Sequence, residues 1–246
     1  MEKKLTGKNA VVTGAGKGIG KAIALGLAEE GASVVCVART RSDLEATATE
    51  IARHHGNALV MPCDVTDADQ VCDLFSAINE KWGKIDLFFI NAGGTLSRNQ
   101  VADSDPRKWK DTVELNLLSA YYCSRYAIPL LRKSDDAKII ITGSGTGRRG
   151  APGISAYSCA KAGLSMFARI LAMELFEENI TVNELIPGPV ETDEALRASS
   201  TWHEEFKQVG EWIKQPKDVV PLALFLACQP PGGPTAQSFS LMRRDT

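Results

Sequence analysis

The stretch Thr13-Gly-Ala-Gly-Lys-Gly-Ile-Gly20 lies between a short apolar run, Asn9–Thr13, and a helical pattern that begins at Gly18. Its glycines at 14, 18 and 20 permit a tight turn and a close approach of the backbone to a pyrophosphate, which the first N–H groups of the helix then face. Because glycines also close ordinary strand–helix turns, the strand–turn–helix context is what makes this pattern specific. The stretch predicts a dinucleotide-binding loop in an α/β protein.

Short β-branched runs alternate with longer helical patterns on the C-terminal side of this loop. The expected strands are Asn9–Thr13, Ser33–Ala38, Ala58–Met61, Asp86–Ile90, Lys138–Thr142, Ile180–Ile186 and Gln237–Leu241. The expected helices are Gly18–Glu30, Ser42–His54 with Ser42 as its cap, Asp67–Trp82, one from Pro106 toward Lys133 that Pro129 kinks, and Ser155–Glu178. This alternation predicts a doubly wound fold.

Strands that are apolar throughout are covered on both faces, which indicates a parallel sheet between two layers of helices. We therefore expect a single Rossmann-type domain over residues 1–246, with a parallel seven-stranded sheet and helices on both faces. Residues 192–210 form a polar insertion that carries Trp202 and Phe206. We expect this insertion to be a substrate lid and residues 229–246 to be the C-terminal strand and tail.

The composition excludes several classes of partner. The chain has 246 residues, 44% of them hydrophobic and 24% charged, with a formal net charge of −2. No basic field is present to attract nucleic acid or an anionic membrane, and no apolar run approaches the ~20 residues of a membrane span. The six cysteines and three histidines lack the spacing of a metal site. We expect a cytoplasmic protein that binds small molecules and no metal.

The end of the second strand is where an NAD site places a carboxylate that accepts hydrogen bonds from the ribose hydroxyls. Here the sequence is Ala38-Arg39-Thr40, with no acid. Arg39 can fork onto a 2′-phosphate, and Lys17 in the glycine loop adds a second cation on the same side. Each alone is typical of a solvated surface charge. Together they favour NADP(H) as the cofactor over NAD(H).

Tyr157 and Lys161 are four residues apart and share one face of a helix. A tyrosine has an ordinary pKa of about 10, and a lysine ammonium a few ångströms away favours the phenolate. Such a tyrosine can protonate a carbonyl oxygen as hydride arrives, or take the proton in reverse. Ser144 follows the fifth strand, where it can hold the substrate oxygen, and Asn116 is an unusual residue inside a helix.

The chain resembles the short-chain dehydrogenase/reductase family from about Leu5 to Leu226. The motifs are Thr13–Gly20, Asp64-Val65, Ile90-Asn91-Ala92-Gly93 with Ile90 in place of the family's asparagine, and Pro187-Gly188 followed by Val190 and Thr192. The resemblance implies the catalytic tetrad Asn116, Ser144, Tyr157 and Lys161, and a homo-oligomer, a tetramer or a dimer. The cofactor-binding residues are expected to be Gly14, Gly16, Lys17, Gly18, Ile19, Gly20, Arg39, Thr40, Asp64, Val65, Asn91, Ala92, Gly93, Tyr157, Lys161, Pro187, Gly188, Val190 and Thr192.

The C-terminus departs from the family pattern. Met242, Arg243 and Arg244 replace the glycines that usually follow the last strand, and Ala236 stands where the family typically has glycine. The family's tetramer interface lies near this strand, which is why a dimer stays open beside a tetramer.

The substrate is less well defined than the reaction. The chain is similar to 3-oxoacyl-carrier-protein reductases, but Met173 replaces an arginine before Glu174, and Arg125, Arg132 and Arg169 are left as contacts for an acidic carrier. Arg148 and Arg149 follow Ser144 closely and can pair with an acidic substrate or remain solvated. The candidate substrate residues are Leu96, Arg148, Arg149, Trp202 and Phe206.

The sequence is compatible with three functions. The first is an NADPH-dependent ketone reductase, or the reverse alcohol dehydrogenase, with Tyr157 as general acid/base. The second is reduction of a 3-oxoacyl thioester on carrier protein or coenzyme A. The third is a non-catalytic dinucleotide-binding regulator, which the complete tetrad disfavours.

Overall fold

The computed structural model describes residues 3–198, 202–208 and 210–243, and its centre is a seven-stranded sheet in the order β3-β2-β1-β4-β5-β6-β7. All six strand pairs are parallel. The strands are β1 Asn9–Thr13, β2 Ser33–Ala38, β3 Asn57–Pro62, β4 Leu87–Ile90, β5 Lys138–Thr142, β6 Thr181–Ile186 and β7 Ser238–Ser240. The chain order reverses between β1 and β4, which is where such sheets bind ligands beyond the carboxyl ends of their strands.

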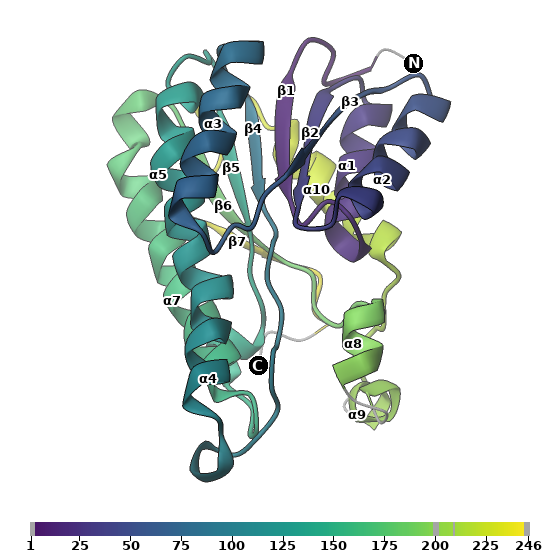
Figure 1. The fold of residues 1–246 in the computed structure, drawn as a ribbon, viewed down its shortest axis with the longest axis vertical. Coiled ribbons are helices and arrows are strands. Elements are labelled where there is room, and N and C mark those ends of the chain that lie inside the picture. Colours follow the sequence, from purple (N-terminus) through teal and green to yellow (C-terminus); the bar gives the residue numbers. More distant parts are fainter. Residues whose placement is uncertain (1–2, 199–201, 209, 244–246) are drawn as a thin grey trace.

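Helices cover both faces of the sheet (Figure 1). They are α1 Gly18–Glu29, α2 Arg41–Arg53, α3 Ala68–Trp82, α4 Pro106–Val113, α5 Ser119–Leu131, α6 Thr146–Arg149, α7 Ser155–Glu174, α8 Asp193–Ala198, α9 Trp202–Gln208 and α10 Val220–Ala227. Figure 1 shows α3, α5 and α7 on one face and α1, α2 and α10 on the other. The predicted parallel seven-stranded sheet between two helical layers is therefore confirmed.

Two apolar cores fill the space between sheet and helices, because successive side chains of a strand point to opposite faces. Val11, Phe88 and Ile139 belong to the core under α3, α5 and α7. Their neighbours Val12 and Phe89 belong to the core under α1, α2 and α10. Burial on both faces explains why these strands read as continuous apolar runs rather than alternating ones.

The helix expected from Pro106 to Lys133 is divided. Pro106 does occupy the first turn, and Asp105 caps it by accepting a hydrogen bond from the N–H of Arg107 at 2.8 Å. The segment Glu114–Leu118 is then π-helical before α5 continues. Turns of this kind are frequent at functional sites, and Asn116, a predicted catalytic residue, lies in this one.

Two other helix boundaries differ from the prediction. Ser42 does not cap α2, because the helix begins one residue earlier and Thr40 takes the N-cap position. The helix expected over Ser155–Glu178 ends at Glu174, and a 3-10 helix, Phe176–Glu178, follows it. Asn179 then adopts the left-handed conformation, with φ 55°, which turns the chain into β6.

Buried charges hold together the edge of the sheet where the strands begin. Asp86, which is fully buried, accepts hydrogen bonds from the backbone N–H of Asn9 at 2.8 Å and the hydroxyl of Ser134 at 2.6 Å. Lys84 approaches the same carboxylate at 3.1 Å. Burial by itself raises the pKa of Asp86, but Ser134, Asn9 and Lys84 outweigh it and hold the pKa below its ordinary value. Beside it, buried Lys138 pairs with Asp136.

The other edge, where the strands end, lies between projecting helices. Figure 1 shows α4 and the pair α8 and α9 reaching beyond the sheet on opposite sides at its lower end. Among the described residues, no helix combines the length and the apolar character needed to cross a membrane. The predicted site residues of the loops after β1, β4, β5 and β6 all belong to this edge, because parallel strands end on the same side.

Candidate active site

The glycine loop after β1 is shaped so that only glycine fits. Gly14 and Gly18 have φ values of 69° and 53°, a region that favours glycine. A Cβ on Gly14 would lie 2.9 Å from Nδ2 of Asn91, and a Cβ on Gly20 would collide with the carbonyl oxygen of Gly14. The loop therefore presents bare backbone at the start of α1, which fits the pyrophosphate of a nicotinamide dinucleotide.

Asn91 joins the end of β4 to this loop. Its backbone N–H donates to the hydroxyl of Thr13 at 2.9 Å, and its Nδ2 donates to the carbonyl of Thr13 at 3.1 Å. The hydroxyl of Thr142, at the end of β5, donates to its Oδ1 at 3.2 Å. The side chain of Asn91 thus holds three neighbouring strands in register at the predicted cofactor site.

The residues expected to select the cofactor lie beyond β2. Arg39 and Thr40 are exposed there, and within the described part of the chain the Arg39 guanidinium has no ion pair or hydrogen bond. Lys17 is placed differently from Arg39, because its ammonium lies 3.1 Å from the carboxylate of Asp43 in α2. Only one of the two predicted cations is therefore without a carboxylate partner in the described chain.

The segment after β6 comes back to the glycine loop. A Cβ on Gly18 would lie 3.1 Å from the methyl group of Thr192. Val190 is buried and forms an isolated parallel bridge with Lys214. Asp64 of the Asp64-Val65 motif, beyond β3, accepts a hydrogen bond from the hydroxyl of Thr66 at 2.8 Å. Both family segments therefore reach the edge that carries the glycine loop.

Lys161 is the buried centre of the predicted catalytic group. Only 3% of it is exposed, and its Nζ donates to the carbonyl oxygen of Thr142 at 2.8 Å. The same Nζ lies 5.7 Å from the centre of the Tyr157 ring, so the two side chains face each other across one helical turn of α7. The lysine ammonium therefore lies beside the ring that carries the predicted acid/base hydroxyl.

Asn116 lies on the other side of this group. Its Oδ1 accepts from the N–H of Gly94 at 3.0 Å, and its Nδ2 donates to the carbonyls of Gly94 at 2.7 Å and Thr112 at 2.8 Å. A Cβ on Gly93 would lie 2.6 Å from Oδ1 of Asn116 and 3.3 Å from Nζ of Lys161. The missing side chain of Gly93 thus lets the asparagine and the lysine approach one another.

Ser144 lies two residues beyond Thr142, the residue that binds Lys161. Its hydroxyl is 3.0 Å from the hydroxyl of Thr146, and it accepts from the N–H of Thr146 at 3.3 Å. The following helix, α6, packs directly on α7: a Cβ on Gly147 would lie 2.8 Å from the carbonyl carbon of Lys161. The fold thus places the four predicted catalytic residues on segments that pack together at one edge.

The candidate substrate residues are more dispersed. Arg149 lies near the Ser144 segment, with Nη2 3.7 Å from the sulfur of Met242, whereas the guanidinium of Arg148 lies 3.7 Å from the carboxylate of Glu184. Leu96 is 45% exposed. Phe206 is half-buried in α9, and the side chain of Trp202 lies outside the described part of the structure.

Two residues at this edge were not among the site residues predicted from the sequence. Met242, from the C-terminal tail, fills the space beside Gly145 and Gly188, where a Cβ would collide with it or nearly so. Lys214 is fully buried, donates to the carbonyl of Trp212 at 2.8 Å and lies over its ring. Burial lowers the pKa of Lys214. The replacement of a family glycine by Met242 could have drawn attention to this residue, but Lys214 belongs to no motif.

The described residues contain no cluster of three or more histidine, cysteine or acidic side chains that could hold a metal ion.

A family model described as short chain dehydrogenase matches residues 8–202. A 3-oxoacyl-[acyl-carrier-protein] reductase of Synechocystis is 34% identical over 243 residues, 96% of each chain. The 7alpha-hydroxysteroid dehydrogenase of Escherichia coli is 34% identical over 236 residues, covering 92% of this chain and 89% of its own length.

The fold gives the same result. A short-chain type dehydrogenase/reductase from Mycobacterium marinum superposes with a TM-score of 0.90 at 29% identity, over 96% of this chain and 94% of its own. Sequence and structure agree over nearly the whole chain. The protein belongs to the short-chain dehydrogenase family and is an oxidoreductase that acts on CH–OH or carbonyl groups.

Proposed function

We propose that the protein is an NADPH-dependent oxidoreductase that transfers hydride between the nicotinamide and a carbonyl compound or secondary alcohol, with Tyr157 as general acid/base. The observation that carries the proposal is the buried ammonium of Lys161, held by the carbonyl of Thr142 at 2.8 Å and directed at the ring of Tyr157. The same site contains the glycine loop, whose exposed backbone can bind a dinucleotide. Carbonyl reduction requires both a proton donor and a bound hydride donor.

The residues that would hold the cofactor fit a dinucleotide. The pyrophosphate would lie against Gly14, Gly18 and Gly20, the adenosine end near Arg39 and Asp64, and the nicotinamide end near Pro187–Thr192. When bound, the cofactor supplies or accepts the hydride. The crowding around Gly14 and Gly20 supports this cradle, because a side chain at either position would fill it.

The protein residues would manage the proton. In the reducing direction the hydroxyls of Ser144 and Tyr157 hold the carbonyl oxygen, and Tyr157 gives its proton to that oxygen as the carbon receives the hydride. Lys161 stabilises the phenolate left behind. The side-chain amide of Asn116 forms hydrogen bonds with the backbone of Gly94 and Thr112. These hydrogen bonds would keep the helical turn at Asn116 accessible to a proton relay from Lys161 to solvent.

The preference for NADPH rests on Arg39. Its exposed guanidinium can donate hydrogen bonds to two oxygens of a 2′-phosphate, whereas Lys17 is already paired with Asp43. We expect Arg39→Asp to reverse the ratio of kcat/KM for NADPH over NADH, and Lys17→Ala to change it less. An unchanged ratio in Arg39→Asp would refute the assignment, and NAD(H) would then be the cofactor.

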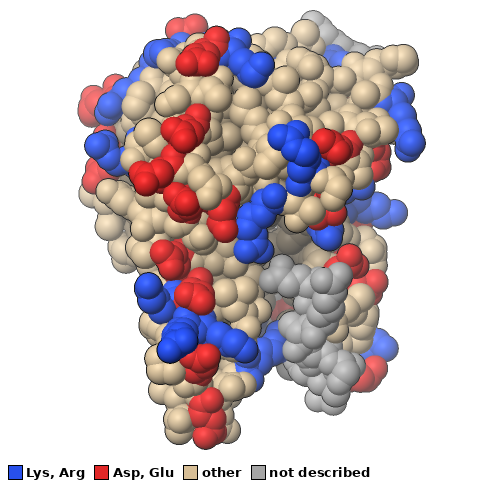
Figure 2. Space-filling view, in the orientation of Figure 1, with Lys and Arg blue, Asp and Glu red and all other residues tan. Residues whose placement is uncertain are grey.

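A small or medium-sized ketone is the favoured substrate class. A carrier-bound thioester needs basic residues on the surface of α5 and α7, and Arg132, one of the three candidates, forms a two-bond ion pair with Glu178 at 2.5 and 2.7 Å. Figure 2 shows acidic and basic side chains mixed over the face in view. The similarity to the Synechocystis reductase keeps 3-oxoacyl thioester reduction as the second candidate function.

The test is a panel of carbonyl compounds followed by the absorbance of NADPH. The panel contains neutral ketones, acidic ketones, and a 3-oxoacyl thioester on coenzyme A and on carrier protein. We expect turnover of free ketones and its loss in Tyr157→Phe. Preference for the thioester would select the second function. Binding of NADPH without any turnover would select the third, a regulator that binds the dinucleotide.

Residues 192–210 are proposed to close over the substrate as a lid on the single domain. The ring Nε2 of His203 in α9 lies 2.5 Å from the carboxylate of Glu191 at the base of this segment. The side-chain pairing lowers the pKa of Glu191. Leu96, Phe206 and Arg149 would line the pocket. Arg149→Ala should raise the KM of acidic ketones without changing that of neutral ones.

We also propose a homo-oligomer, a dimer or tetramer, in the cytoplasm. Met166, Ile170 and Met173 repeat at helical spacing on α7 and are 55%, 47% and 76% exposed, and Tyr121 on α5 is 48% exposed. An apolar stripe of this kind is typical of an interface between chains. A sedimentation-velocity experiment tests it: Ile170→Asp should dissociate the oligomer, and a monomeric wild-type protein would refute it.

A further inference from the structure

Glu184 is a charged residue in the middle of β6, a strand whose residues are all buried. Only 3% of it is exposed. A carboxylate removed from water destabilises a protein by several kcal/mol unless hydrogen bonds and a counter-charge replace its hydration. The partners of Glu184 therefore indicate what the residue is for.

Three of these partners converge on one oxygen of the carboxylate. The hydroxyl of Ser238 in β7 donates to Oε2 at 2.5 Å, and that of Ser165 in α7 donates to it at 3.1 Å. Nη2 of Arg148 in α6 lies 3.7 Å from the same oxygen. A single side chain of β6 thus contacts the consecutive helices α6 and α7 and the distant strand β7.

The other oxygen of Glu184 lies against the backbone that leads to Ser144. A Cβ on Gly143 would overlap Oε1, so glycine is the residue that fits there. Gly143 precedes Ser144 by one residue, and Arg148 follows it by four. The carboxylate therefore contacts the chain on both sides of Ser144.

The hydroxyl partner on α7 connects this junction to the predicted proton-transfer pair. Ser165 lies one helical turn after Lys161, on the same helix as Tyr157. The segment that carries Ser144 and the helix that carries the tyrosine and the lysine are thus held by the same carboxylate. Their relative position decides whether the serine and tyrosine hydroxyls can meet one substrate oxygen.

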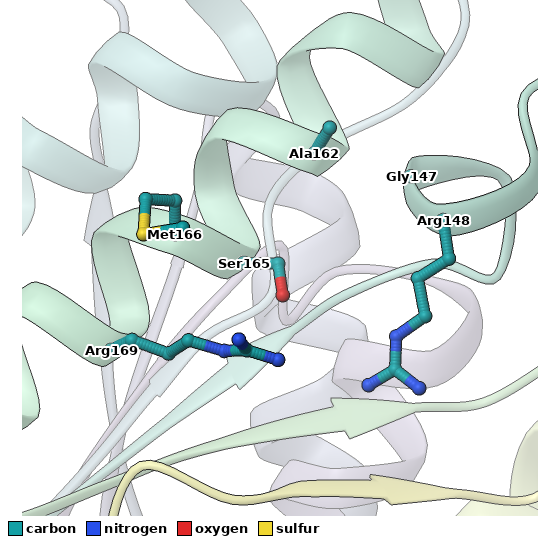
Figure 3. Close-up of a pocket in the computed structure, with 6 residues that line it drawn as sticks. All are labelled: Gly147, Arg148, Ala162, Ser165, Met166 and Arg169. Atoms are coloured by element: carbon teal, nitrogen blue, oxygen red, sulfur yellow. The ribbon is translucent and has the colours of Figure 1, made fainter.

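A cavity lies beside the contacts that Glu184 makes with Arg148 and Ser165, and it shows why these side chains need to be held in place. It has a volume of about 370 Å³ and is lined by Gly147, Arg148, Ala162, Ser165, Met166 and Arg169. In Figure 3 the guanidinium groups of Arg148 and Arg169 reach toward this space from α6 and α7. Side chains next to a cavity have room to take other positions. The charge of Glu184 favours the position of Arg148 in which its guanidinium lies 3.7 Å from the carboxylate.

We propose that Glu184 is a positioning residue for the hydride-transfer reaction: its buried carboxylate fixes the Ser144 segment against the helix of Tyr157 and Lys161. This inference rests on the proposed function. The contacts of Glu184 with Ser165, Ser238, Arg148 and Gly143 place it behind Ser144.

The test compares Glu184→Gln with Arg148→Gln and with the double variant. Glutamine keeps the size of the side chain and an oxygen that accepts from the serines, but it removes the charge that holds Arg148. We expect kcat for a ketone to fall about 10-fold or more in each single variant, with the dissociation constant of NADPH within twofold of wild type. The double variant should lose no more than either single one, because both remove the same link.

Asp86→Asn is the matched control, since Asp86 is a buried carboxylate at the opposite edge of the sheet. It should lower the Tm and leave kcat unchanged. If Glu184→Gln and Arg148→Gln likewise lower only the Tm, Glu184 is a structural residue and the proposal is overturned. Should Glu184→Gln not fold, Arg148→Gln decides alone, because the Arg148 side chain is one-third exposed.

Amide hydrogen exchange separates this inference from the proposed function. If the wild-type protein reduces no carbonyl compound, the proposed function fails by itself. Faster exchange of residues 143–150 in Glu184→Gln, with unchanged exchange in the glycine loop, would still show that the carboxylate fixes this segment. Unchanged exchange over residues 143–150 would overturn the positioning role.

Discussion

The two edges of the parallel sheet each contain a buried lysine and a buried carboxylate, yet only one edge has the features of an active site. Where the strands begin, the two groups are Lys138 and Asp86; where they end, they are Lys161 and Glu184. Burial of charge is therefore the same at both edges. What differs is what surrounds each group.

At the first edge the charges are satisfied by one another and by the ends of strands. Lys138 pairs with Asp136, and Asp86 is bound by Asn9, Ser134 and Lys84. At the second edge Lys161 binds a backbone carbonyl and faces the Tyr157 ring.

This difference teaches that burial of a charge does not by itself indicate a function, because the kinds of group around the charge differ between the two edges. Removal of one partner of a buried ion pair destabilises the fold, whereas an ammonium beside a tyrosine is the arrangement that the proposed acid/base role of Tyr157 needs. Four experiments would sharpen or break the comparison.

The largest effect is expected from Lys161→Met. Removing the ammonium should lower kcat/KM for a ketone by about 10³-fold, or roughly 4 kcal/mol of barrier. Lys138→Met removes the buried lysine of the other edge and should leave kcat/KM within twofold. Steady-state kinetics of both variants checks this, and equal losses would show that the two edges are not functionally distinct.

Asp86→Asn should lower the free energy of unfolding by about 2 kcal/mol, because several hydrogen bonds to a charged group are weakened. The pKa of Asp86 lies below its ordinary value of 3.8 in the folded protein. Its contribution is therefore present above that value and is lost as the pH falls through the folded pKa. Urea unfolding between pH 3 and pH 7 should show a flatter pH dependence in Asp86→Asn, and a parallel dependence would contradict the assignment.

Gly20→Ala should weaken the binding of NADPH by about 10-fold, or roughly 1.4 kcal/mol. The new methyl group collides with the carbonyl of Gly14 and displaces the loop. Gly26→Ala is the control on the same helix, because its methyl group meets the side chain of Val220 far from the loop. Fluorescence titration should find weakened binding only in Gly20→Ala; equal effects would mean that general disturbance of α1 is the cause.

The smallest effect is expected from Ala236→Gly near the C-terminal strand. Ala236 has a φ of 59°, which is strained for alanine, so glycine should raise the free energy of unfolding by about 0.5–1 kcal/mol. Thermal unfolding should show a Tm about 2–4 °C higher per kcal/mol. A lower Tm would mean that the lost methyl contact matters more than the backbone strain.

Much of the fold was predictable because its signals are local. The glycine loop, the continuous apolar strands and the alternation with helices need only neighbouring residues, and the seven parallel strands agree with them. Boundaries were less accurate: Ser42 does not cap α2, and the long helix is interrupted at Glu114–Leu118. In the interrupted segment Asn116 forms hydrogen bonds with Gly94, 22 residues away, a contact that no local propensity contains.

The candidate site divides in the same way. Tyr157 and Lys161 share a helical turn, so their proximity follows from their spacing. The pairing of Lys17 with Asp43, 26 residues away, is the kind of contact that spacing does not reveal. Arg148 illustrates the same limit, since its partner Glu184 lies on another strand.

By itself the sequence determined the reaction class, because the glycine turn and the Tyr–Lys pair are built within single turns of chain. Only the tertiary structure decided which partners the other charged side chains have. It paired Lys138 with Asp136 and Arg148 with Glu184, and it brought Met242 beside Gly145. The physical reason is that the energy of a buried charge depends on partners within a few ångströms, and the fold, not the order of residues, selects those partners.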